Sequence, residues 1–197
     1  MTIRKKLNNQ GFTLMELVIA TGISMVILGA ITGTFITQTK FYNAQEQVNE
    51  MQQNARAAMD LMSRDIKLAG YTPTGAAVTG VAYSASELRI RADLDGDGAI
   101  NDASDEHVVY TFDSANLQIK RAYGGVGATQ EVLANNITSF TFGYLDSSGA
   151  ATMVQADIRQ VSLNVTARTA KPDPTLSSNG YRTYALSNLI TPPNLAY

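Results

Sequence analysis

The sequence contains no cysteine and a single histidine, His107. Without cysteine, the chain has no disulfide bond, no zinc–thiolate site and no thiol nucleophile. One histidine also excludes clusters of histidine ligands and the H-E-x-x-H motif of zinc peptidases. Thiol hydrolases and histidine-based metal centres are therefore excluded.

Motifs of other enzyme classes are missing as well. The chain has no G-x-S-x-G motif, and the glycine-rich stretch "YGGVGAT" is not followed by the lysine of a phosphate-binding loop. A Ser-His-Asp triad would need His107, which lies beside an acidic stretch at the start of an expected strand. We therefore expect a protein that is not an enzyme.

Basic residues are few, and the formal net charge is −2. Arg4, Lys5 and Lys6 lie close together near the N-terminus, and all 17 acidic residues follow them. The rest of the chain is thus acidic, and it has no basic stripe interleaved with aromatic residues. Such a surface does not favour phosphate backbones, so we expect no nucleic-acid partner.

Proline is absent before Pro73, and charge is absent between Glu16 and Lys40. The apolar run from Leu17 to Ile36 is about 20 residues long, or roughly 30 Å as a helix, which matches the hydrocarbon thickness of a bilayer. Basic residues ahead of the run predict that the N-terminus stays in the cytoplasm and the bulk of the chain crosses. A carboxylate entering this segment costs about 2.5–3.5 kcal/mol, so Glu16 needs an explanation.

The stretch "GFTLMELVIA" that contains Glu16 resembles the processing motif of type IV prepilins and the related pseudopilins. In that motif a glycine precedes a phenylalanine, and a glutamate follows the phenylalanine by four places. The resemblance implies that residues 1–11 are a leader peptide, which a prepilin peptidase removes, and that the new N-terminal amine is methylated. The matching residues are Gly11, Phe12, Thr13, Leu14 and Glu16.

Two hypotheses explain the acidic residue at the head of the apolar run. In a plain membrane anchor, Glu16 would extend its carboxylate into the interface. In a filament of packed helices, the carboxylate would instead pair with the Phe12 amine of a neighbouring subunit, which sets the axial register because an unpaired buried charge is strongly disfavoured. Glu16 is then an assembly residue.

The helical pattern continues past the apolar run to Gly70, which suits a C-terminal cap. We expect one helix over residues 12–70, with residues 12–38 in the membrane or the filament core. Its second half carries an apolar stripe at spacings of three and four, which predicts packing on a folded domain. The stripe consists of Val48, Met51, Ala55, Met59, Met62, Ile66 and Ala69.

Residues 71–197 alternate between apolar and polar side chains with a period of two, which predicts strands. Examples are Leu88 with Ile90, and Phe140 with Tyr144. Short turn-like connections favour antiparallel pairing. The fold class is therefore α+β, with a long N-terminal helix packed on an antiparallel β-sheet head. "TAKPDPTLSSNG" is expected to be an exposed loop before a last strand near Tyr181–Leu186.

This architecture agrees with the pilin fold, and a second stretch narrows the resemblance. The segment "MQQNARAAMDLMSRDIKLAGY", followed by a β-rich domain, resembles the PilW-type minor pilins. The GspJ-type pseudopilins of type II secretion share a similar helix end.

The stretch "DLDGDGAINDASDE" has the spacing of a calcium-binding loop, because D-x-D-x-D-G places carboxylates at positions 1, 3 and 5 and glycine at 6. Ser104 stands where the twelfth position should carry an acid, and a nearby acid would have to replace it. Expected strands on both sides argue against an EF-hand. The alternative is an exposed, empty turn. The candidate ligands are Asp93, Asp95, Asp97, the Ala99 carbonyl, Asn101, Asp102, Asp105 and Glu106.

Together these features predict a minor pilin of a type IV pilus that acts in pilus assembly. The resemblance implies a single-pass protein of the cytoplasmic membrane, with its head outside the cytoplasm, that reaches the cell surface in the pilus. Its partners would be prepilin peptidase, other major and minor pilins and the assembly platform. The alternatives are a pseudopilin of type II secretion and a membrane-anchored calcium-binding domain that does not assemble.

Overall fold

The computed structural model describes residues 11–101, 103–173, 175–176 and 180–195. The chain divides into two units, of which the first ends at Asn43 and the second begins at Ala44. Helix α1, Leu14–Leu68, begins in the first unit and ends in the second.

Every described residue of the first unit is exposed, although most of its side chains are apolar. The serine and threonine hydroxyls in this part of α1 nevertheless donate hydrogen bonds within the helix. Ser24 Oγ donates to the Ala20 carbonyl at 2.7 Å, and Thr32 Oγ1 donates to the Leu28 carbonyl at 2.8 Å. Further hydroxyls that donate to the preceding turn belong to Thr21, Thr34, Thr37 and Thr39.

The second unit buries the apolar stripe of α1 that the sequence predicts. Ala55, Met62, Ile66 and Ala69 are fully buried, while Met51 and Met59 are almost so. The helix ends at Leu68, and Gly70 follows with a φ of +75°, in the left-handed region that glycine tolerates. Its N–H donates to the Arg91 carbonyl at 2.9 Å, which ties the end of the helix to the first sheet.

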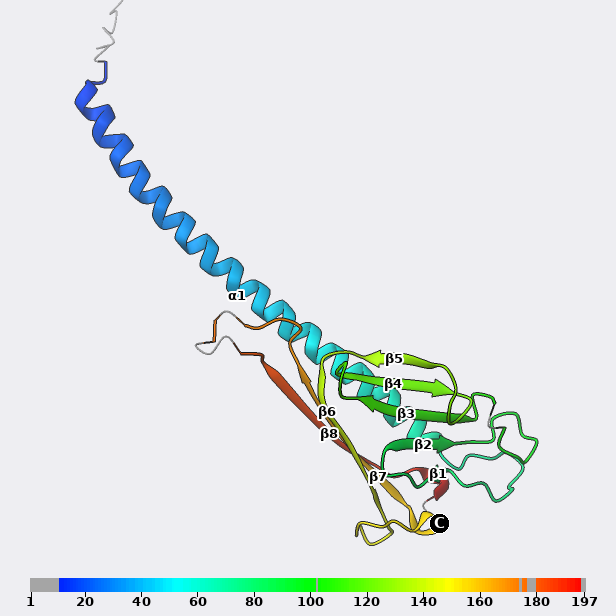
Figure 1. The fold of residues 1–197 in the computed structure, drawn as a ribbon. Helices are drawn as coiled ribbons and strands as arrows, with labels where there is room; N and C mark the ends of the chain where they lie inside the picture. Colours follow the sequence, from blue (N-terminus) through cyan, green and yellow to red (C-terminus); the bar gives the residue numbers. More distant parts are fainter. Residues whose placement is uncertain (1–10, 102, 174, 177–179, 196–197) are drawn as a thin grey trace, which may run out of the picture. The chain divides into compact units, whose positions relative to one another are not determined.

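Eight strands occur within the described residues, and all pairings between them are antiparallel. They form a five-stranded sheet in the order β1-β2-β3-β4-β5 and a three-stranded sheet in the order β6-β7-β8, beside the second half of α1 (Figure 1). The strands are β1 Val81–Ala82, β2 Glu87–Arg91, β3 His107–Asp113, β4 Gln118–Tyr123, β5 Gln130–Ala134, β6 Ile137–Leu145, β7 Gln160–Arg168 and β8 Thr183–Ile190. Two short 3-10 helices are η1 Gln155–Asp157 and η2 Pro193–Leu195.

The predicted α+β class is confirmed, since one long helix packs on antiparallel strands. The sequence did not reveal that the strands divide into two sheets, nor the existence of β1 and β5. One core joins the helix to both sheets, and its largest fully buried side chains include Tyr110, Met62, Ile66, Leu88, Ile119 and Leu163.

A buried charged cluster joins α1 to the five-stranded sheet. Asp65 of α1 is 8% exposed and accepts hydrogen bonds from the Tyr110 hydroxyl at 2.5 Å and from Arg121 Nη2 at 2.6 Å. Arg121 also stacks on the Tyr123 ring, 4.0 Å from its centroid. Burial, together with the neighbouring Asp65 carboxylate, raises the pKa of Tyr110 well above its ordinary value. The cluster keeps its charges inside the fold because each has a partner.

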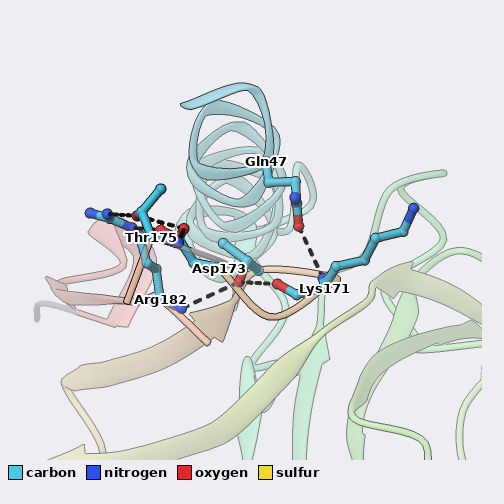
Figure 2. A network of polar contacts seen from close by, with 6 residues as sticks. Gln47, Lys171, Asp173, Thr175 and Arg182 are labelled. Atoms are coloured by element: carbon cyan, nitrogen blue, oxygen red, sulfur yellow. Dashed lines mark hydrogen bonds and ion pairs between the residues drawn. The ribbon is translucent and has the colours of Figure 1, made fainter. Parts of the chain in front are cut away.

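Hydrogen bonds and an ion pair also hold the connection between β7 and β8 in place (Figure 2). Asp173 is 2% exposed and accepts bonds from Thr175 Oγ1 at 2.7 Å and from Arg182. These bonds to the charged carboxylate lower the pKa of Asp173 to about 2. The Lys171 N–H donates to Gln47 Oε1 of α1 at 3.1 Å. The expectation of a wholly exposed loop was therefore wrong at Asp173 and at the buried Thr169.

Candidate functional site

The predicted cleavage point, between Gly11 and Phe12, lies just ahead of α1 in a stretch without secondary structure. Phe12 is 92% exposed, and a Cβ added at Gly11 would meet nothing within 4 Å. The space around Gly11 therefore does not require glycine at this position. Residues 1–10 of the predicted leader lie outside the described residues.

Glu16 has a local partner that the sequence analysis did not anticipate. Thr13 precedes the helix, and both its N–H and its Oγ1 donate to Glu16 Oε2 at 2.8 Å. In return, the Glu16 N–H donates to Thr13 Oγ1 at 3.2 Å. This reciprocal arrangement is a capping box, which satisfies orphan N–H groups of the first helical turn. A carboxylate near a helix N-terminus also interacts favourably with the helix dipole.

The segment that follows exposes a continuous apolar surface. Within the described residues, α1 is the one helix that is long and apolar enough to cross a membrane. Ile19, Val26 and Phe35 are each more than half exposed. Apolar surface of this extent has to be covered by lipid or by other helices.

The acidic stretch forms the connection between β2 and β3, so strands flank it as predicted. Asp93, at the first loop position, is fully buried and accepts N–H bonds from Gly96 at 2.7 Å and from Gly98 at 3.1 Å. Gly98 has a φ of +84°, the left-handed conformation that turns the loop and that favours glycine. Thr72 Oγ1 donates to the same carboxylate at 3.0 Å. The loop therefore wraps around Asp93.

Glu106 closes the loop from its far end. Its carboxylate accepts N–H bonds from Leu94 at 2.8 Å and from Asn101 at 2.8 Å, and it is 3% exposed. The N–H groups of Asn101 and Asp95 are the main cause of a lowered pKa of Glu106, so this carboxylate stays charged. The calcium-loop pattern calls for an acid at the twelfth position, where this chain has Ser104. Glu106 is the nearby acid that folds into the loop.

The structure brings only some of the predicted ligands together. Oxygens of Asp93, Asp95 and Glu106 all lie within 4.8 Å of one another. Among the described residues, Asp97 and Asp105 are not in this group. Asp97 and Asn101 instead accept backbone N–H bonds from Ala99 at 2.8 Å and from Ala103 at 3.0 Å. Asp102 lies outside the described residues.

Two models of known protein families match this chain. The model of the prokaryotic N-terminal methylation motif matches residues 6–32. The model of prepilin peptidase-dependent protein B matches residues 44–186, most of the second unit. The chain belongs to the prepilin peptidase-dependent protein B family. A comparison with curated proteins finds no match.

The match of the methylation motif to residues 6–32 and the match of the family model to residues 44–186 together confirm the resemblance to type IV pilin-like proteins. The methylation motif and the apolar segment of α1 together make the chain a pilin-like, membrane-anchored protein. Pilin-like families consist of structural subunits.

Two features of this prepilin peptidase-dependent family member escaped the sequence analysis. Thr13 belongs to the cleavage motif, and its spacing from Glu16 is also the T-x-x-E signature of a capping box. The Asp65–Arg121 pair left no local signal, because its residues lie on a helix and a distant strand. Only the fold brings these two residues together.

Proposed function

We propose that this chain is a minor pilin of a type IV pilus, with a structural and not a catalytic role. The observation that carries the proposal is the exposed Gly11–Phe12 bond directly ahead of the capped, exposed apolar first part of α1. The family models that match residues 6–32 and 44–186 support it.

The mechanism follows from the charges that cleavage creates. Before assembly, the apolar helix holds the chain in the cytoplasmic membrane with the head outside. Removal of the leader gives Phe12 a free amine, which is then methylated and stays cationic. In a packed bundle, Glu16 of one subunit pairs with the Phe12 amine of the next, and out-of-register packing leaves both charges unpaired. Assembly is thus guided by one ion pair on an otherwise apolar rod.

The test is mass spectrometry of the mature N-terminus, performed on filaments sheared from cells. We expect a chain that begins at methylated Phe12. Gly11→Val should block cleavage, whereas Gly22→Val should not, although both glycines have open space around them. A chain in sheared filaments that still starts at Met1 would overturn the proposal. Mature chain found only in the membrane fraction would favour the pseudopilin.

We also propose that the acidic loop binds calcium, on the observation that carboxylate oxygens of Asp93, Asp95 and Glu106 converge. Calcium prefers 6–8 oxygen ligands, and three converging carboxylates supply the charge that such a site needs. The ion would stabilise the loop between β2 and β3 by binding the folded state alone.

Calcium at a hundredfold excess over Kd should raise the Tm of the full chain in detergent by about 5–10 °C relative to EDTA. The Asp95→Asn variant should lose most of this shift. Asp60→Asn, which removes an exposed acid of α1, should keep it. Equal Tm values with calcium and with EDTA would contradict a calcium site.

A further inference from the structure

Strand β8 is an outer strand, and its second edge pairs with no strand among the described residues. All eight of its residues, Thr183–Ile190, pair with β7, and no other strand of the described residues pairs with it. Figure 1 shows β7 and β8 side by side at the margin of the second unit. A free edge presents unpaired N–H and C=O groups, which is a template for a further strand.

The other outer strands of the two sheets carry features that hinder such pairing. Strand β1 has two residues, and β5 contains Glu131 and lies beside a register shift. Strand β6 has a register shift near Ile137, and its Tyr144 hydroxyl donates to the carbonyl of Ser84 at 3.2 Å. Strand β8 contains no charge, no proline and no break in register. It therefore lacks the usual protection of an edge strand.

The side chains of β8 leave apolar surface incompletely covered. Tyr184 and Leu186 are only partly buried, although they lie opposite the buried Ala167 and Val165 of β7. On the other face of β8, Leu189 is 56% exposed. An added strand would cover both faces of this edge while its backbone completes the hydrogen bonds.

Charge indicates which kind of strand would pair here. Arg56 of α1 lies 5.8 Å from the Tyr184 ring centroid, and Arg168 lies 4.2 Å from that of Tyr181. Arg182 directly precedes β8, and its side chain is 46% exposed. Buried Asp173 pairs with Arg182 and offsets its charge, so the basic groups that count beside this strand are Arg56 and Arg168.

Basic side chains also lie on the side of α1 next to β8. Asn188 Nδ2 donates to Ser63 Oγ at 2.9 Å, which places this helix side beside the strand. Arg64 and Lys67 lie within a turn of Ser63, as do two acids, of which Asp60 is exposed and Asp65 is buried and paired with Arg121. The surroundings of the β8 edge are thus basic, and charge complementarity favours an acidic partner.

We propose that β8 accepts, as a fourth strand of its sheet, an extended segment of another filament subunit that carries acidic residues. This names a partner surface for the minor pilin proposed above and rests on that function. The backbone of the segment provides affinity, and its acidic side chains meet Arg56 and Arg168. A second copy of the chain is disfavoured, because each copy brings the same basic groups to the edge.

The test measures peptide binding to the full chain in detergent micelles by fluorescence anisotropy. The probe is a labelled peptide of alternating threonine and valine with two glutamates at each end, and its control has lysines in place of the glutamates. We expect the acidic probe to bind at least about tenfold more tightly than the basic one, with an advantage that shrinks as salt is added.

A matched pair of variants at Ser187, an exposed residue in the middle of β8, locates the binding site. Ser187→Glu should weaken binding of the acidic probe about tenfold, whereas Ser187→Lys should retain it, with both Tm values unchanged. The proposal is overturned if the two probes bind equally, if neither binds, or if the Glu variant binds as well as the Lys variant.

Self-pairing is checked by light scattering on the same micelles. A dimer that Ser187→Glu dissociates would assign the edge to a second copy and overturn the proposal. A monomer in both cases supports it. N-terminal processing is measured on the same variants, so methylated Phe12 without probe binding contradicts the strand proposal alone and leaves the proposed function standing.

Discussion

Glu16→Ala is expected to leave cleavage at Gly11 and membrane insertion intact, and to reduce incorporation into filaments by at least about tenfold. The reason is the partner left behind, because a buried charge that loses its counter-ion costs about 3–5 kcal/mol, well above the 1.4 kcal/mol of a tenfold change. In this variant the Phe12 amine would enter the bundle without a carboxylate. The measurement is the ratio of mature chain in sheared filaments to mature chain in membranes.

The capping box supplies a sharp control for this result. Glu16→Gln removes the charge, but a glutamine amide oxygen still accepts the bonds from Thr13. If the ion pair with Phe12 directs assembly, Gln and Ala variants should be equally defective. If Glu16 merely caps the helix, the Gln variant should assemble normally, and the pairing hypothesis is then wrong.

Asp65→Ala is expected to destabilise the head by about 3–5 kcal/mol, which lowers Tm by about 6–20 °C for a chain of this size. The substitution leaves the Arg121 guanidinium buried without its carboxylate, and it removes the acceptor of the Tyr110 hydroxyl. Thermal unfolding in detergent, followed by near-UV circular dichroism, measures the change.

Asp60→Ala on the same helix is the matched control, because Asp60 is exposed and should change stability by less than about 0.5 kcal/mol. Replacing Asp65 and Arg121 together with apolar residues should recover much of the loss, since an apolar pair has no charge to leave unpaired. An Asp65→Ala variant as stable as Asp60→Ala would show that the cluster does not hold α1 on the sheet.

The parts of the fold with strong periodicity were predictable from the sequence. The stripe that includes Met62 and Ile66 repeats at helical spacing, and it lies in the core as expected. Strand β1 has only two residues, and β5 begins with exposed residues after a glycine-rich turn. Neither gives a clear alternation. The division into two sheets depends on which strands meet in space, and no local pattern records it.

The candidate sites also differ in how far the sequence alone predicts them. Cleavage at Gly11 is a local property of a short motif, so the sequence suffices to predict it. For the acidic loop, spacing identified Asp93 and Asp95, but the choice of Glu106 over Asp105 required the loop to close. Burial of Glu106 beneath the N–H groups of Leu94 and Asn101 decides that choice.

The hydroxyls of α1 that donate to their own helix have a consequence for how a subunit leaves the bilayer. The hydroxyls of Ser24 and Thr32 already donate to carbonyls one turn back. These two groups therefore need no new hydrogen-bond partner during extraction. In the filament proposed above, transfer from acyl chains to neighbouring helices would exchange one apolar environment for another. The free-energy cost of extracting a subunit should therefore come mainly from the charges that bound the apolar segment, Glu16 and Lys40.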